Sequence, residues 1–316
     1  MSDLCDELRA GRPDGASAVT FGVFDGVHLG HLHVLNKLRA AAGARGLTPV
    51  VVTLANHPLS VLRPEVPVVW LTTLDERMKL MRASGIEWVI PITFTHEISL
   101  YTPEEFMGYL CDCLGLRHFL VGPDFALGQG REGTLPVLTT LGAELGYGVE
   151  VAPAFDLEGV PVRSSTIRKA LADGDLATVE RLLGRPFALE GPVIEGERMG
   201  AGLLGFPTAN LGLGPLQALP ADGVYATWAT VGGDRYAAAT SVGIKPTFHA
   251  DGPRVVESFV LDFDGDLYER RVRLEFVRRL RGQERFESVE ALVEQMQRDV
   301  AETRTALDAA PRPLEA

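Results

Sequence analysis

The chain has 316 residues, of which 46% are hydrophobic and 23% are charged, and its formal net charge is −12. This length suits two domains of about 100–200 residues each, and the composition is that of a globular protein with a sizeable core in each half. The negative charge argues against non-specific binding to nucleic acid or to an acidic membrane surface.

Three cysteines, Cys5, Cys111 and Cys113, cannot all pair within one chain. The Cys111–Cys113 spacing is too tight for a zinc knuckle and has no second half, so we expect all three to be reduced thiols. The N-terminus is acidic and lacks an apolar signal core, and no apolar run is long enough to span a bilayer. We therefore expect a cytoplasmic protein with no nucleic-acid or membrane partner, and a weak or transient homo-oligomer stays open.

The first half alternates strand-like and helix-like segments. Short apolar runs predict buried strands at 18–24, 49–54, 88–92, 119–121 and 149–152. Apolar residues at helical spacing predict helices at 31–42, 74–84, 103–114 and 137–145. This alternation favours a Rossmann-like doubly wound parallel sheet with helices on both faces, over residues 1–185.

From Phe187 onward, short β-rich segments are separated by Gly, Pro and Asp. Strands are expected at 187–195, 223–230, 235–242, 255–263 and 271–276, which predicts an antiparallel barrel or sandwich. A final helix begins at Ser288 as N-cap and carries one apolar stripe to about Leu307. We assign residues 186–316 to this second domain.

The first predicted strand runs into Gly22-Val23-Phe24-Asp25-Gly26-Val27-His28-Leu29-Gly30-His31. A strand, a Gly-rich turn and a helix start form the usual nucleotide site of an open α/β sheet. The glycines let the backbone approach phosphates, and His28 and His31 can donate hydrogen bonds to them. Adenylyl transfer needs such donors at the α-phosphate and the departing pyrophosphate. Two alternatives stay open: a zinc site that adds His33, and a cluster of structural histidines.

Two further segments carry polar side chains suited to anions or cations. Ser164 and Ser165, followed by Arg168 at a helix start, can bind anionic oxygens, although an ordinary helix cap with a surface arginine is the alternative. Thr208 and Asn210 are two residues apart, so both lie on one face of an extended segment and can offer oxygens to Mg²⁺ on ATP phosphates. The alternative is a turn in which both side chains bond their own backbone.

The segment at 22–31 resembles the G-x-F-D-G-x-H-x-G-H signature of the prokaryotic bifunctional riboflavin kinase/FMN adenylyltransferase family, also called FAD synthetase. The resemblance extends from about Thr20 to about Thr303. Residues 53–58 resemble the T-F-x-P-H-P stretch of the family, with Leu54, Ala55 and Asn56 departing from it. Residues 122–133 resemble its G-x-D/N-F-x-F-G loop. Residues 162–168 resemble its I/V-S-S-T-x-I-R loop, with Arg163 for the first serine and Ser165 for the threonine.

The second half continues the resemblance. Residues 205–211 closely resemble the G-F-P-T-A-N-L kinase segment, and 241–248 resemble N-I-G-x-x-P-T-F with Ser241 for Asn. Residues 256–268 resemble V-E-x-h-l-l-D-F-x-G-D-L-Y, with Glu269 where Gly is usual. The family's arginine before P-T-A-N is missing at Ala201-Gly202.

The resemblance implies an N-terminal domain of the H-x-G-H nucleotidyltransferase type that joins the AMP of ATP to FMN, and a C-terminal barrel that phosphorylates riboflavin to FMN. ATP, riboflavin and FMN are the implied substrates, and Mg²⁺ the implied cofactor. The implied catalytic residues are His28, His31, Arg168 and Glu257, the last as the base for the riboflavin 5′-hydroxyl. The implied metal ligands are Thr208 and Asn210. The implied binding residues are Gly22, Phe24, Asp25, Gly26, Gly30, His57, Asp124, Phe125, Ser164, Ser165, Gly205, Pro207, Thr208 and Asn210.

Three other functions are weighed against this one. The departures at residues 54–56, Arg163, Ser165 and 201–202 allow a member of the family that keeps one activity only. A non-enzymatic flavin- or nucleotide-binding protein is a second alternative, against which the full set of catalytic residues argues. A third is an H-x-G-H adenylyltransferase for a pantetheine or nicotinate nucleotide, which would not need the P-T-A-N segment.

Overall fold

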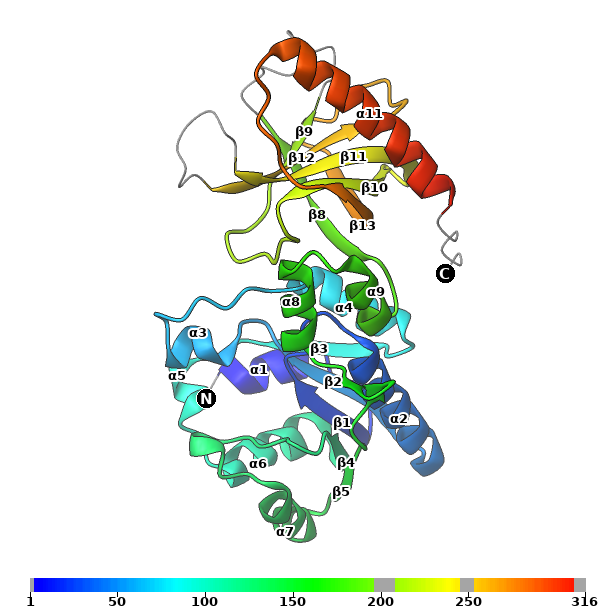
Figure 1. Cartoon of the computed structure of the whole chain (residues 1–316). Coiled ribbons are helices and arrows are strands. Elements are labelled where there is room, and N and C mark those ends of the chain that lie inside the picture. The colour runs from blue at the N-terminus through cyan, green and yellow to red at the C-terminus, as the bar shows by residue number, and fades with distance from the viewer. Residues whose placement is uncertain (1–2, 196–207, 245–252, 310–316) are drawn as a thin grey trace. The chain divides into compact units, whose positions relative to one another are not determined.

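A computed structural model of the chain describes residues 3–195, 208–244 and 253–309. The chain divides into two compact units, Met1–Ser164 and Ser165–Ala316 (Figure 1).

A five-stranded parallel sheet forms the centre of the first unit, with strand order β3-β2-β1-β4-β5. Its strands are β1 (Ser17–Gly22), β2 (Thr48–Leu54), β3 (Trp88–Ile92), β4 (Leu116–Val121) and β5 (Gly148–Val151). Neighbouring residues of one strand enter different cores: Val50 and Val52 belong to one apolar cluster and Val51 to the other. Both faces are therefore buried, and the predicted doubly wound sheet is confirmed.

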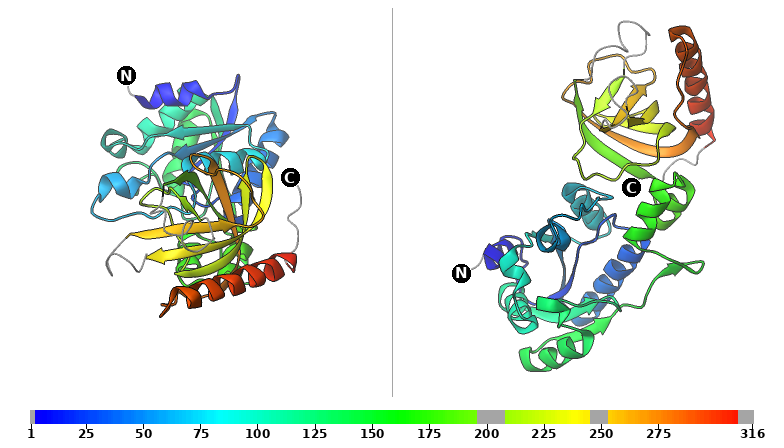
Figure 2. Two further views of the ribbon diagram at one scale, coloured as in Figure 1. Left: turned by 90° about the horizontal axis from the view of Figure 1, so that it is seen from above. Right: turned by 60° about the vertical axis from the view of Figure 1, so that its left-hand side comes forward.

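Helices cover both faces of this sheet (Figure 2). One apolar cluster joins the sheet to α1 (Asp3–Ala10), α6 (Pro103–Leu114) and α7 (Leu135–Leu145). The other joins it to α2 (Leu29–Arg45) and α4 (Leu74–Ala83). Three short helical pieces lie in the connections: α3 (Pro58–Leu62), α5 (His96–Ser99) and the 3₁₀ turn η1 (Gln129–Arg131).

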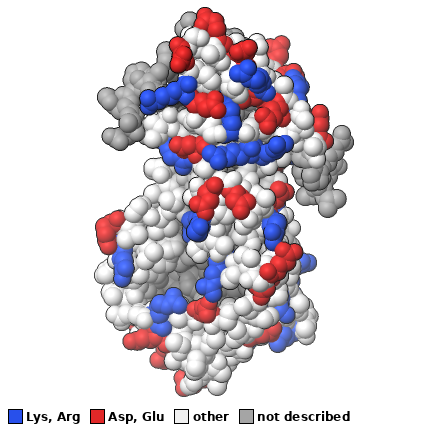
Figure 3. All heavy atoms as spheres, in the orientation of Figure 1, with Lys and Arg blue, Asp and Glu red and all other residues white. Residues whose placement is uncertain are grey.

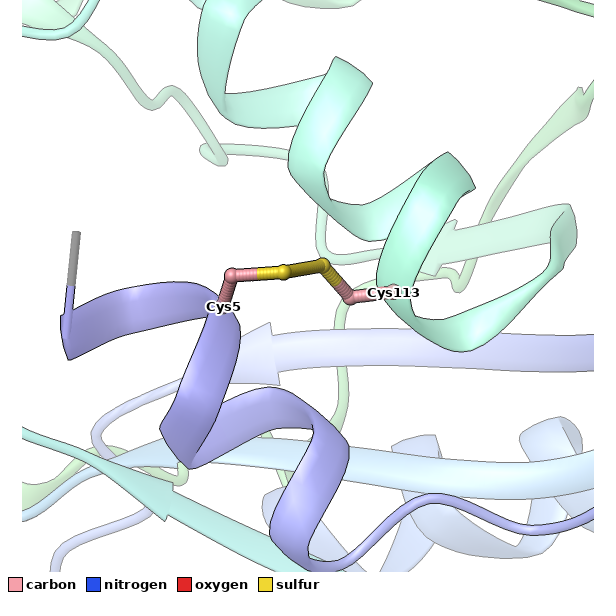
Figure 4. Close-up of a disulfide and its surroundings, with 2 residues drawn as sticks. All are labelled: Cys5 and Cys113. Atoms are coloured by element: carbon pink, nitrogen blue, oxygen red, sulfur yellow. A yellow bond between two sulfur atoms is a disulfide. The ribbon is translucent and has the colours of Figure 1, made fainter. Parts of the chain in front are cut away.

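The expectation of three reduced cysteines is wrong for Cys5 and Cys113, which form a disulfide between α1 and α6 (Figure 4). The N-terminal residues, for which no element was predicted, form α1, whose Leu4 and Leu8 are 1% and 0% exposed. This packing brings Cys5 to within 6.2 Å, Cα to Cα, of Cys113, a separation that suits a disulfide. Cys111 is free and half-buried.

A two-stranded ribbon, β6 (Asp156–Leu157) with β7 (Val160–Pro161), ends the first unit. Helices α8 (Ser164–Ala172) and α9 (Leu176–Leu183) follow, and α9 contacts two barrel strands, β8 and β13. The domain boundary predicted at residue 185 lies after these two helices and stays a prediction.

Six strands of the second unit close into a barrel in the order β10-β11-β12-β9-β8-β13. They are β8 (Phe187–Ile194), β9 (Ala209–Leu211), β10 (Gly223–Val231), β11 (Asp234–Ile244), β12 (Arg254–Val260) and β13 (Arg271–Arg281). Because the ladder of strands is closed, the second unit is a barrel, and the predicted alternative of a sandwich is wrong. Helix α11 (Val289–Asp308) begins after its N-cap Ser288, as predicted, and packs on β10, β11 and β13.

Acidic and basic side chains alternate over the face of the barrel unit seen in Figure 3, and neither sign forms a continuous field there. Within the described ranges, none of the helices has the length and the apolar composition needed to cross a bilayer.

Candidate functional sites

The histidine turn (residues 22–31) lies at the carboxyl end of β1 and leads into α2. His28 caps α2, and its Nδ1 accepts a hydrogen bond from the backbone N–H of His31 at 3.2 Å. The two imidazole rings stack with centroids 3.6 Å apart and planes 15° apart, and the edge of Phe24 meets His31. The sequence therefore folds both histidines onto the first turn of a helix, where backbone N–H groups favour anions.

Asp25 is 2% exposed and fixes this turn to the segment before α4. Its carboxylate accepts hydrogen bonds from the backbone N–H groups of Leu71, at 3.0 Å, and of Thr72, at 3.2 Å. The Gly26 N–H donates in turn to the Thr72 hydroxyl at 3.0 Å. Phe24 is also buried, at 6%. Phe24 and Asp25 thus stabilise the conformation of the turn. Their role in binding substrate stays a prediction.

Gly30 lies where the histidine turn meets the segment that leads into α8. A Cβ at this position would lie 3.0 Å from the carbonyl oxygen of Val162 and 3.2 Å from the His28 ring. The Ser164 hydroxyl donates to the backbone carbonyl of Asp25 at 2.8 Å. Two segments that are far apart in sequence, and that were both predicted to contact phosphates, are therefore in direct contact.

Ser165 and Arg168 follow Ser164 in the first two turns of α8 and belong to the second unit. Their roles stay predictions.

The loop after β4 contributes Asp124 and Phe125. Phe125 packs edge-on against Phe119 and Phe21, with centroids 5.6 and 6.3 Å apart, so it anchors the loop on the core. Asp124 is exposed and forms an ion pair of 3.0 Å with Arg163. Arg163, which departs from the family pattern, therefore ties this loop to the segment before α8.

His57 caps α3, and its Nδ1 accepts a hydrogen bond from the Leu59 N–H at 3.1 Å. Its ring meets Trp70 edge-on at 5.8 Å. A cap of this kind accounts for a histidine directly before Pro58 at a helix start, and the binding role of His57 stays a prediction.

The zinc alternative gains no support from this geometry. Stacked imidazoles present their faces to each other, so the nitrogens of His28 and His31 do not converge on one ion. His33 turns to Phe155 instead, at 5.3 Å. Among the described residues no group of three or more His, Cys, Asp or Glu is suited to hold a metal ion.

In the barrel, Asn210 and Glu257 stand directly opposite each other in the antiparallel pair β9–β12. Glu257 is also directly opposite Ser241 in the pair β11–β12. Residues opposite one another in a ladder project on the same face, with Cβ atoms about 4.5–5.5 Å apart. Asn210, Glu257 and Ser241 thus form one row, which we call the barrel row, while Ser258 next to Glu257 is buried at 2%.

Thr208 lies two residues before Asn210, directly ahead of β9, and is half-buried. The other predicted residues of this segment, Gly205 and Pro207, lie outside the described residues, as do Ala201, Gly202 and residues 245–248. Gln283 was not predicted; its side-chain amide donates to the Ser241 hydroxyl at 3.2 Å and to the Val242 carbonyl at 3.1 Å.

Arg77 on α4 is a second residue that sequence reasoning missed. It is 1% exposed and donates to the backbone carbonyls of Val23 and Leu54, beside the histidine turn. A signal was present: Arg77 occupies the same helical stripe as Leu74, Met78 and Met81, so a charged residue interrupts a core-facing row.

Comparisons with known proteins cover nearly the whole chain. A family model described as FAD synthetase matches residues 12–166, and one described as riboflavin kinase matches residues 183–307. Two relatives, from Pseudomonas fluorescens and Bacillus subtilis, are 37% and 32% identical over 93% and 90% of this chain, and the matches cover 94% and 91% of the relatives. Both relatives are named bifunctional riboflavin kinase/FMN adenylyltransferase.

A crystal structure described as a macrolide-efflux protein from Streptococcus pneumoniae superposes with a TM-score of 0.83 at 28% identity, covering 94% of this chain and 96% of that one. The two family models match the two units in the order in which their motifs occur, and relatives above 30% identity span the same length. The chain therefore belongs to the bifunctional riboflavin kinase/FMN adenylyltransferase family.

Proposed function

We propose that this chain makes FAD from riboflavin in two ATP-dependent steps, one on each unit. The barrel phosphorylates riboflavin to FMN, and the parallel-sheet unit joins FMN to the AMP of ATP with release of pyrophosphate. The observation that carries this proposal is the presence of both family domains in one chain.

For adenylyl transfer, the histidine turn supports direct attack. A phosphate oxygen of FMN attacks the α-phosphorus of ATP, and the bond to the β,γ-pyrophosphate breaks, so no covalent enzyme intermediate is needed. His28, His31 and the N–H groups at the start of α2 neutralise the charge that develops on these oxygens. Ser164 holds the carbonyl of Asp25, and Arg168 is proposed to add its guanidinium to the same charge.

For riboflavin phosphorylation, the barrel row supports an in-line transfer. Glu257 accepts the proton of the ribityl 5′-hydroxyl as that oxygen attacks the γ-phosphorus and ADP leaves. Asn210 opposite Glu257, together with Thr208, offers the neutral oxygen ligands that suit a hard cation. Mg²⁺ bound there would neutralise the phosphates of ATP.

The flavin product profile tests both steps. Purified full-length protein is incubated with riboflavin, ATP and Mg²⁺, and a second sample receives FMN in place of riboflavin. FMN followed by FAD is expected in the first sample and FAD in the second. Absence of both products overturns the proposal. FAD from FMN alone, or FMN without FAD, favours the family member with one activity, and flavin binding without ATP turnover favours the non-enzymatic alternative.

A cytoplasmic location is part of the proposal, because both steps consume ATP. The Cys5–Cys113 disulfide argues the other way, since cytosolic thiols are kept reduced. Counting the free thiols of protein trapped with an alkylating agent inside the cell decides between a bonded and a reduced pair. A weak or transient homo-oligomer also belongs to the proposal, and sedimentation velocity at several protein concentrations tests it.

A further inference from the structure

Arg77 joins the ends of two central strands from within the core. One of its terminal nitrogens donates to the carbonyls of Val23, at 2.5 Å, and of Leu54, at 3.0 Å, and the other to Ala55 at 3.3 Å. Val23 directly follows β1, Leu54 ends β2, and Ala55 comes next. The planar fork of a guanidinium can satisfy several carbonyls at once, which a lysine ammonium does with less geometric control.

The turn that Arg77 holds carries backbone strain. Phe24 has φ 53° and Val27 has φ 38°, both in the left-handed region. For residues with a Cβ this region is sterically disfavoured, and for a β-branched residue such as valine it is a rare conformation. Such a conformation persists only where its surroundings over-determine it.

The surroundings of this turn are buried and polar. Val23 precedes Phe24, and its carbonyl accepts a hydrogen bond from Arg77. Asp25 follows Phe24, and its carboxylate accepts hydrogen bonds from the N–H groups of Leu71 and Thr72. Asp25 is also the acidic group whose charge acts on Arg77, and Trp70 stacks on the guanidinium at 4.5 Å. Burial lowers the pKa of Arg77 to about 10, against the opposing effect of Asp25, so the guanidinium stays charged at neutral pH.

Both strand ends that Arg77 joins lead into predicted site segments. Val23 precedes Asp25 and His28 in the histidine turn, and Ala55 precedes His57. A shift of about 1 Å in such a segment can reduce a rate about 100-fold, because in-line attack requires aligned groups. Loss of Arg77 would release both ends together.

We infer that Arg77 is a positioning residue for adenylyl transfer. It stabilises the histidine turn, with Phe24 and Val27 in the left-handed region, from the core side and without contacting substrate. This inference rests on the proposed FMN adenylyltransferase activity of the first unit. It concerns that activity alone, because the barrel row lies in the other unit.

The test compares Arg77→Met, Arg77→Lys and Arg82→Met in the full-length chain. Arg82 lies on the same helix and is exposed, so Arg82→Met is the matched control. With Arg77→Met we expect kcat/KM for FAD formation from FMN to fall about 100-fold, mainly through kcat. Arg77→Lys should recover part of that loss, Arg82→Met should leave it unchanged, and all three should phosphorylate riboflavin at the wild-type rate.

A double-mutant cycle separates positioning from general stability. Thr72→Val removes the hydroxyl that bonds Gly26 and Asp25, and so loosens the same turn from its other side. If both residues act through the turn, the loss in Arg77→Lys/Thr72→Val is smaller than the product of the single losses. These two variants also carry the test if Arg77→Met does not fold.

Several outcomes overturn the inference. One is an unchanged rate of FAD formation in Arg77→Met and Arg77→Lys. Another is an equal loss of both activities in a folded variant. A third is a loss in the double variant that equals the product of the two single losses. Wild-type protein that makes no FAD from FMN contradicts the proposed function instead, and this is read in the same assay before any variant is examined.

Discussion

The histidine turn and the barrel row differ in what fixes their side chains. The turn is irregular, contains two non-glycine residues with positive φ, and depends on buried polar groups contributed by other segments. In the barrel row, the antiparallel register itself sets Glu257 opposite both Asn210 and Ser241. A site on paired strands is positioned by the strand register, whereas a site on an irregular turn requires buried residues that bond its backbone. If each unit carries its own site, a substitution in one site should impair one of the two activities and leave the other unchanged.

The largest effect is expected from Glu257→Gln in the barrel row. Removing a general base costs about 10²–10⁴-fold in rate, so riboflavin phosphorylation should fall by that factor. FAD formation from supplied FMN should keep its wild-type rate. The two rates are measured by separating flavins after single-substrate incubations. Glu275→Gln on β13, where Glu275 pairs with Arg235, is the control and should alter neither rate. Loss of both rates in folded Glu257→Gln protein would contradict two separate sites.

The reciprocal change is His31→Ala in the histidine turn. Removal of one charge-stabilising donor costs about 10²–10³-fold, so FAD formation should fall by that factor while FMN formation from riboflavin is kept. His96→Ala, which changes an exposed histidine on α5, is the control for the substitution. If FAD formation survives His31→Ala, the resemblance assigns the wrong histidine.

The disulfide should stabilise the first unit only. A cross-link that closes a loop of 108 residues contributes about 2–5 kcal/mol to the free energy of unfolding. Cys5→Ser should therefore lower the free energy of unfolding of the first unit by that amount. In calorimetry the melting temperature of the first unit should fall, and that of the barrel should stay unchanged. Cys111→Ser, at the free cysteine, is the control. Unreduced wild-type protein denatured in guanidinium should titrate as one thiol, and a count of three would contradict the bond.

The smallest effect is expected from pH. Burial, followed by the charge of Arg45, lowers the pKa of His118 on β4, while Glu150 acts to raise it. A histidine with a lowered folded pKa stabilises the fold fully above its unfolded pKa of about 6.5. That contribution is lost as the pH falls through the lower folded value. The first unit should thus melt at a lower temperature at pH 5 than at pH 7.5, and His118→Gln should flatten this dependence. An equal slope in the barrel transition would show a general acid effect.

Much of the fold follows from local pattern, and the remainder depends on long-range contacts. The apolar runs predict all five parallel strands because both faces of that sheet are buried. The same reasoning misses α1, because a short acidic segment gains its helix by burying Leu4 and Leu8 on α6. It also fails for Cys5 and Cys113, whose pairing requires that packing.

The candidate sites divide in the same way. The spacing of two singles out Thr208 and Asn210 as candidates, whose role stays a prediction, and the local sequence places His28 directly before a helix, where it caps α2. The pairing of Asn210 with Glu257 depends on the register between β9 and β12, which no local pattern contains. Arg77 and Thr72 are found only once the structure shows which backbone groups they bond.

The register of the barrel row has a consequence for how this protein can vary. Successive residues of β12 face opposite ways, so inserting one residue before Glu257 would turn its carboxylate toward the interior position of Ser258. A buried, unpaired carboxylate is costly, and the neighbouring strands of a closed ladder leave β12 no free edge to shift along. Relatives should therefore differ in length within the connections between barrel strands, while β9, β11 and β12 keep a fixed length even where their side chains change.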